Sequence, residues 1–113
     1  MRKRKVGGVA VERGSGSVYA DLGFPDAEEM EIKAQLVTKI GEIIKKKGLN
    51  QTQAAGRLGL TQPMLSNILR GHFRGVSERR LMDCLTKLGR DVQIVVKPAR
   101  HSRPRGQLSV VFA

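Results

Sequence analysis

Residues 51–71 have the sequence Gln-Thr-Gln-Ala-Ala-Gly-Arg-Leu-Gly-Leu-Thr-Gln-Pro-Met-Leu-Ser-Asn-Ile-Leu-Arg-Gly, and this stretch decides the fold. Its first half has apolar residues at three- and four-residue spacing, which predicts a helix over residues 51–58 with one buried face. The residues of that face are Ala54, Ala55 and Leu58. Gly59 follows, and glycine is the residue best suited to the left-handed backbone just past a helix end. We therefore expect a short helix that ends in a tight turn.

A second short helix is predicted directly after this turn. Thr61 offers a hydroxyl to the first amides of the helix, and Pro63 fits within the first turn, where amides have no intrahelical partner. The helix should end near Arg70, because Gly71 follows. Its apolar stripe consists of Leu65, Ile68 and Leu69, and the opposite face carries Gln62, Pro63, Ser66, Asn67 and Arg70. Amides and a guanidinium on one helical face suit the edges of DNA bases, and an α-helix fits the major groove.

The stretch resembles the helix-turn-helix of the phage-repressor and xenobiotic-response-element (XRE) family. The positions that carry this resemblance are Gln51, Ala55, Gly59, Leu60 and Gly71. The resemblance implies an all-α, lambda-repressor-like bundle of four to five helices that binds double-stranded DNA. It also implies base contacts from Gln62, Pro63, Ser66, Asn67 and Arg70. Pro63 departs from the family pattern, so we expect only van der Waals contact there, for instance with a thymine methyl group.

Phosphate contacts are expected around this recognition face. The predicted set is Gln51, Thr52, Thr61, His72 and Arg74. Gln51 belongs to it through the family resemblance, whereas Arg74 lies in the loop that would face the DNA backbone. For His72 two interpretations remain, contact with a phosphate or capping of the preceding helix.

The composition agrees with a polyanionic partner. The chain has 113 residues and a formal net charge of +11, which favours nucleic acid or an anionic membrane surface. No apolar run approaches the roughly 18 residues of a membrane span. The first 13 residues carry five basic residues against one acid, and four basic residues with no acid follow from Lys97 onward. We therefore expect a flexible basic arm (1–24), a DNA-binding domain (25–97) and a basic tail (98–113).

Two further helices are predicted on either side of the central stretch. Asp26 as N-cap and Glu29 three residues later form a capping-box pattern, followed by about 20 residues with a regular apolar stripe. Ser77 should cap a last helix that ends near Leu88. Cys84 lies beside the apolar stripe of that helix, and a lone cysteine indicates a small core residue in a reducing compartment. No metal site or cofactor is expected.

The period of the apolar residues changes from 3.6 to 2 after this helix. Val92, Ile94 and Val96 alternate with other residues and Pro98 ends the run, which predicts a β-strand. An isolated strand has bare edges, so we expect it to pair with the same strand of a second molecule across a dimer. The alternative partner is residues 108–112, folded back as a hairpin.

A narrower resemblance covers residues 20–98 and involves the order of the elements. The Leu-Gly-Phe-Pro-Asp-Ala-Glu-Glu entry (22–29) and the closing Asp-Val-Gln-Ile-Val-Val run (91–96) resemble the HigA-type antitoxin branch. This implies a cytoplasmic, dimeric repressor that also binds a cognate toxin. Alternatives are an interaction protein that only sequesters a toxin, or an RNA-binding module, although aromatic residues make up only 4% of the chain. No arrangement of side chains typical of an enzyme is present in the sequence.

Overall fold

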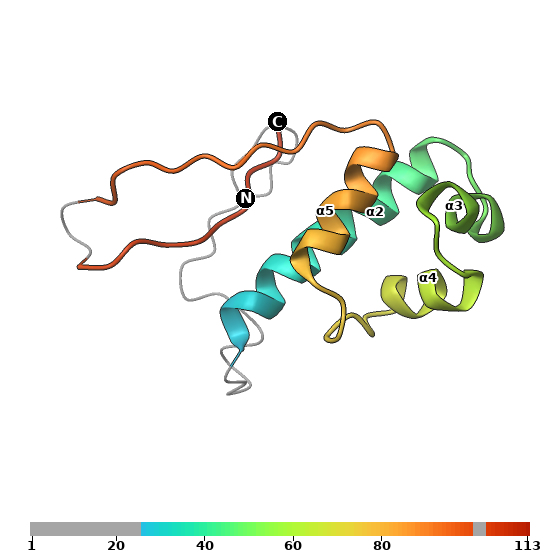
Figure 1. Ribbon diagram of the computed structural model, residues 1–113, viewed down its shortest axis with the longest axis horizontal. Coiled ribbons are helices and arrows are strands. Elements are labelled where there is room, and N and C mark those ends of the chain that lie inside the picture. Colours follow the sequence, from blue (N-terminus) through green and yellow to red (C-terminus); the bar gives the residue numbers. More distant parts are fainter. Residues whose placement is uncertain (1–25, 101–103) are drawn as a thin grey trace.

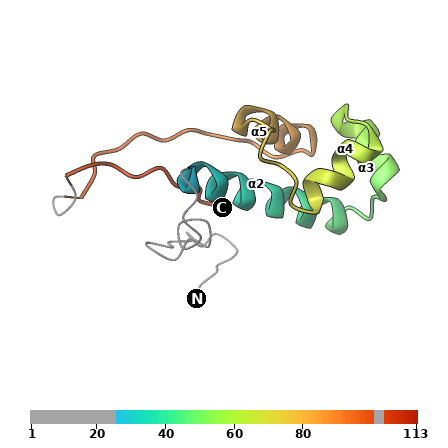
Figure 2. The same ribbon diagram turned by 90° about the horizontal axis from the view of Figure 1, so that it is seen from below.

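Four helices form the described part of the chain, which covers residues 26–100 and 104–113 of a computed structural model (Figure 1). They are α2 (Ala27–Lys46), α3 (Gln51–Leu58), α4 (Gln62–Leu69) and α5 (Glu78–Lys87). The long α2 packs against α5 and α4, and α3 packs against α4 and α5. In Figure 2 the pair α3–α4 lies at the same end of the molecule as the C-terminal end of α2. The predicted all-α helix-turn-helix bundle is therefore confirmed, whereas the predicted arm, residues 1–24, lies outside the described residues.

The turn between α3 and α4 has the predicted backbone. Gly59 follows α3 with a φ of 71°, in the left-handed region that glycine tolerates best. The Thr61 hydroxyl accepts a hydrogen bond from the Met64 amide at 3.2 Å, which confirms the predicted cap of α4. In the same way, the Ser77 hydroxyl accepts from the Arg80 amide at 3.1 Å and caps α5. Local sequence signals thus fix both ends of the turn and the start of the last helix.

The start of α3 has a capping box that the sequence analysis missed. The Gln53 amide donates to Asn50 Oδ1 at 2.8 Å, and the Asn50 amide donates to Gln53 Oε1 at 3.0 Å. Because this pattern satisfies two otherwise unpaired amides, it fixes where α3 begins. The Asn-x-x-Gln spacing is visible in the sequence and is the signal that would have predicted it.

The core contains the apolar stripes that the sequence predicts. The buried residues of these stripes are Ile32, Leu36, Ile40, Ile43, Ile44, Ala54, Ala55, Leu58, Leu65, Ile68, Leu81, Leu85 and Leu88. Cys84 is also buried, and this burial raises the pKa of its thiol, as expected for a small core residue. Phe73 and Lys33 are buried as well, and neither was predicted to be. Lys33 connects α2 to the loop after α4 through its bond to the Arg74 carbonyl, and Phe73 anchors that loop in the core.

The predicted capping of α2 by Asp26 is wrong. Asp26 occupies the N-cap position, but its carboxylate makes no capping hydrogen bond and instead pairs with the Arg74 guanidinium. Glu29, the expected second member of the box, pairs with Lys33. The Arg74 guanidinium carries a full positive charge, which a backbone amide does not, so it attracts the carboxylate more strongly.

The predicted C-terminal strand is also wrong for the single chain. The described residues contain no strand, and 90–100 leave α5 as an extended segment without a ladder (Figure 1). Val92 packs against the core, whereas Ile94 and Val96 are 79% and 91% exposed. An alternating sequence becomes a strand only when a neighbour pairs with its backbone, and residues 26–100 and 104–113 form no such ladder with it.

The last ten residues return alongside this extended segment, as both views show (Figures 1 and 2). Val110 packs against the core, and the Lys39 ammonium lies 5.1 Å from the centre of the Phe112 ring. The final residues of the chain are therefore held on α2 by an apolar contact and a cation–π contact. Within the described residues, no helix is both long and apolar enough to cross a membrane.

Candidate nucleic-acid interface

The outer face of α4 presents the residues predicted to contact bases. Gln62, Pro63, Asn67 and Arg70 are exposed, and Ser66 is half-buried. Leu65 and Ile68 on the opposite face are buried in the core, so packing fixes the rotation of the helix. The predicted side chains therefore lie together on one solvent-facing surface, which we call the recognition face (Gln62, Pro63, Ser66, Asn67 and Arg70).

One edge of the recognition face is joined to α3. Gln62 Nε2 donates a hydrogen bond to Gln51 Oε1 at 2.8 Å, between residues at the first positions of the two helices. Because the Gln51 oxygen accepts this bond, its own amide group keeps two N–H donors for another acceptor. Thr52 is exposed beside it in the first turn of α3. This edge of the site thus offers donors, which are the groups that phosphate oxygens require.

The far end of α4 holds a second side-chain pair. The Arg70 guanidinium donates to Asn67 Oδ1. This bond limits the rotamers of both residues and leaves the remaining guanidinium N–H groups and the Asn67 amide donors directed to solvent. Two of the predicted base contacts are therefore coupled to each other and should act as a unit.

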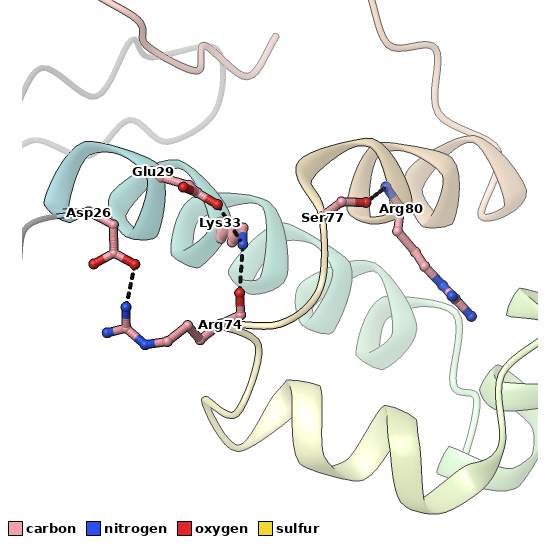
Figure 3. Close-up of polar contacts among 6 residues, drawn as sticks. All are labelled: Asp26, Glu29, Lys33, Arg74, Ser77 and Arg80. Carbon is pink, nitrogen blue, oxygen red and sulfur yellow. Dashed lines mark hydrogen bonds and ion pairs between the residues drawn. The ribbon is translucent and has the colours of Figure 1, made fainter.

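The loop after α4 is fixed by long-range contacts to α2, as Figure 3 shows. Phe73 is 4% exposed and packs in the core. Lys33 on α2 is 3% exposed, and its Nζ donates to the Arg74 carbonyl at 2.8 Å and pairs with Glu29 at 2.9 Å. Asp26 pairs with the Arg74 guanidinium, and that hydrogen bond holds the pKa of the Asp26 carboxyl below its usual value. We call Asp26, Glu29, Lys33 and Arg74 the loop clamp.

The clamp changes how the predicted phosphate contacts in this loop are understood. Arg74 is exposed but already pairs with Asp26 within the protein. His72 is exposed, and its backbone amide donates to the Asn67 carbonyl at 2.9 Å, so the backbone rather than the ring closes α4. The Thr61 hydroxyl likewise serves the Met64 amide. Thr61 thus has the capping role that the sequence predicts, whereas the pairing of Arg74 with Asp26 was not foreseen.

The other edge of the recognition face has a cation that sequence reasoning missed. Arg80 of α5 extends toward α4 (Figure 3), and its guanidinium lies 3.9 Å from Met64 Sδ. Met64 is 39% exposed and lies on α4 between Pro63 and the buried Leu65. The Arg-Arg pair at residues 79 and 80 is visible in the sequence, but only packing shows that Arg80 reaches α4.

Two helices joined by a glycine turn, with a polar, solvent-facing second helix, form the architecture by which transcriptional regulators bind DNA. A family model described as a helix-turn-helix domain matches residues 18–97. A solved structure titled "Putative XRE Family Transcriptional Regulator" is 39% identical, with a TM-score of 0.74, over 79% of this chain and all of that one. The chain therefore belongs to the XRE-type helix-turn-helix family of DNA-binding transcriptional regulators. No curated protein matches the chain.

Proposed function

We propose that the protein is a sequence-specific regulator that inserts α4 into the major groove of double-stranded DNA and acts as a repressor. The observation that carries this proposal is the recognition face, an exposed polar helical surface held by side-chain pairs at both ends. A scaffold helix needs no such surface. Fixed donors and acceptors lose little entropy when they meet base edges, which favours discrimination between sequences.

Each residue of the face has a chemical role in this proposal. Gln62 and Asn67 suit adenine, because an amide can donate to N7 and accept from N6. Arg70 suits guanine N7 and O6, and Ser66 offers one hydroxyl at the centre of the face. Pro63 supplies only van der Waals contact. Each good bidentate pair is worth roughly 1–3 kcal/mol of discrimination.

Phosphate contacts would fix the position of α4 in the groove. In this proposal the free N–H groups of Gln51 bind a phosphate, and the exposed hydroxyl of Thr52 lies beside them. Thr61, His72 and Arg74 complete the predicted set of phosphate contacts, and all three are exposed. The basic arm (1–24) and tail (98–113) would add attraction that depends on salt and not on sequence.

Repression would require two recognition helices, so the proposal includes a homodimer. Ile94 and Val96 are large apolar side chains that remain exposed in the single chain, on a segment that forms no ladder within the described residues. Pairing with the same segment of a second copy would bury these apolar side chains and give the backbone groups hydrogen-bond partners. A dimer would place two α4 helices in half-sites about 10 to 10.5 base pairs apart.

Sedimentation at tens of micromolar tests the dimer. The protein should sediment as a dimer, and Ile94→Lys should shift it to monomer with unchanged helicity, because a charge in the pairing face is costly to bury. A monomeric wild-type protein would remove the dimer from the proposal.

The resemblance to the antitoxin branch adds a cognate toxin as a protein partner. Co-purification of a protein encoded next to this chain would test that part separately.

Selection from random duplex DNA at physiological salt tests the central proposal. The expected result is an enriched inverted repeat. Asn67→Ala should then weaken binding to the selected duplex by about five- to 150-fold, which corresponds to the roughly 1–3 kcal/mol of a bidentate contact. Binding to an unrelated duplex of equal length should change much less. Equal losses on the two duplexes would mean that Asn67 does not contact bases.

The Asn67–Arg70 hydrogen bond makes a second prediction for the same assay. If the two residues act as a unit, the loss in the Asn67→Ala/Arg70→Ala double variant should be smaller than the combined losses of the two single variants. Fully additive losses would show that each residue contacts the DNA independently.

A further inference from the structure

A groove between α5 and the α3–α4 turn carries an excess of positive charge. Its volume is about 390 Å³, and it is lined by Leu58, Gly59, Ser77, Arg79, Arg80, Asp83, Cys84 and Lys87. Lys87 pairs with the single carboxylate, Asp83, at 3.2 Å and donates to the Leu58 carbonyl at 3.4 Å. The acid of the groove is thus neutralised within the protein, and the two arginines supply its net charge.

Arg79 and Arg80 are both exposed, and within the described part of the chain neither forms an ion pair. Among the described residues, the Arg80 guanidinium contacts the Met64 thioether, which is a weak acceptor. Both arginines line one groove whose single carboxylate, Asp83, is already paired with Lys87, so an anion would be attracted there. A phosphate, with several acceptor oxygens, matches the geometry of a guanidinium best.

The position of Arg80 relative to α4 identifies which anion is within reach. The Gln51–Gln62 bond marks the edge of the recognition face next to α3, whereas Met64 points to the opposite flank, toward α5. When α4 occupies a major groove, the two DNA strands run along these two flanks. Gln51 therefore approaches one strand, and Arg80 lies where the other strand passes.

We infer that Arg79 and Arg80 bind phosphates of the DNA strand that passes along the α5 flank of α4, opposite to the strand contacted by Gln51. This inference rests on the proposed function, since it requires α4 in the major groove. It assigns a phosphate contact to α5, outside the helix-turn-helix itself. The contact would hold the second strand and keep α4 from rolling in the groove.

The test is the salt dependence of DNA binding, measured between about 50 and 300 mM salt for wild type and Arg80→Ala. Each lost phosphate contact should reduce the magnitude of the slope of log K against log[salt] by about 0.9. Arg80→Ala should show this change on both the selected duplex and an unrelated duplex, with affinity about fivefold lower near 150 mM salt. Arg79→Ala/Arg80→Ala should lower the slope by about 1.8, twice as much. Arg80→Lys should restore most of the slope, since lysine keeps the charge.

Arg90→Ala is the matched control. Arg90 is exposed beyond the opposite end of α5, and its removal changes the net charge by the same amount. The slope of log K against log[salt] for Arg90→Ala should equal that of wild type. An unchanged slope in Arg80→Ala, or an equal change in Arg90→Ala, would overturn the inference and leave the proposed function intact. If selection yields no enriched duplex, sequence-specific binding fails, while the slope on unrelated DNA still tests Arg80.

Discussion

The buried lysine of the loop clamp allows a stability prediction in which two effects of opposite sign compete. Lys33→Met keeps the volume and the apolar stem of the side chain but removes the bond from Nζ to the Arg74 carbonyl. A hydrogen bond from a charged group contributes about 1.5–3 kcal/mol. Against this, methionine avoids the cost of removing an ammonium group from water. We expect a net destabilisation of roughly 1–2 kcal/mol, because the Arg74 carbonyl loses its partner.

Glu29→Gln provides the control for the ion pair in the same cluster. The Glu29 side chain is 48% exposed, and the glutamine oxygen can still accept a hydrogen bond from the buried Lys33 ammonium, so the cost should stay below about 1 kcal/mol. Urea unfolding followed by circular dichroism would measure both variants, with an unchanged m-value as the sign of two-state behaviour. For Lys33→Met, the melting temperature should fall by roughly 5–10 °C.

The comparison of the two variants shows whether the Lys33 bond to the Arg74 carbonyl or the Lys33–Glu29 ion pair stabilises the loop. If Lys33→Met is as stable as wild type, the cost of burying the charge cancels the bond to Arg74, and Lys33 does not hold the loop in place. If Glu29→Gln costs as much as Lys33→Met, the ion pair and not the carbonyl bond stabilises the loop. Either result would refute the reasoning from burial and distance.

Two further predictions concern the glycines in and after α3 and the stability of the protein at low pH. Gly59→Ala should destabilise by about 1–2 kcal/mol because its φ is 71°, whereas Gly56→Ala, in the interior of α3 with open space at its Cβ, should stabilise by about 0.5–1 kcal/mol. Equal signs in thermal unfolding would contradict the conformational argument. Because the Arg74 hydrogen bond lowers the pKa of Asp26 in the folded state, wild type should exceed Asp26→Asn in stability above pH of about 4, and this advantage should vanish as the pH falls through the lowered pKa. An advantage that persists at lower pH would mean that Asp26 stabilises the fold without its charge.

The arginine pair of α5 extends the surface that we expect to contact DNA beyond the helix-turn-helix. In the proposed complex, Gln51 would approach the DNA from α3, the recognition face from α4, and Arg80 from α5. Because the three helices share one core, a change in their packing would alter all three contacts together. The loop clamp matters for the same reason, since it fixes the path of the chain between α4 and α5.

The sequence by itself determined the features that depend on near neighbours in the chain. The helices, the turn at Gly59 and the caps at Thr61 and Ser77 follow from patterns within a few residues, because backbone propensity and capping are local. The recognition face was predictable for the same reason, as helical spacing alone places Gln62, Ser66 and Asn67 away from the buried stripe. The Asn50 capping box was equally local, and its pattern was present in the sequence.

Only the tertiary structure decided the contacts between residues far apart in the chain. Asp26 had two chemically reasonable partners, the nearby amides of α2 and Arg74, which lies 48 residues away, and packing brought the cation close enough to take the carboxylate. The burial of Phe73 and Lys33 and the approach of Arg80 to Met64 likewise depend on how α2, α4 and α5 meet. The alternating run at Val92–Val96 is not a strand in the single chain, because a strand requires hydrogen bonds to a partner that its own sequence does not specify.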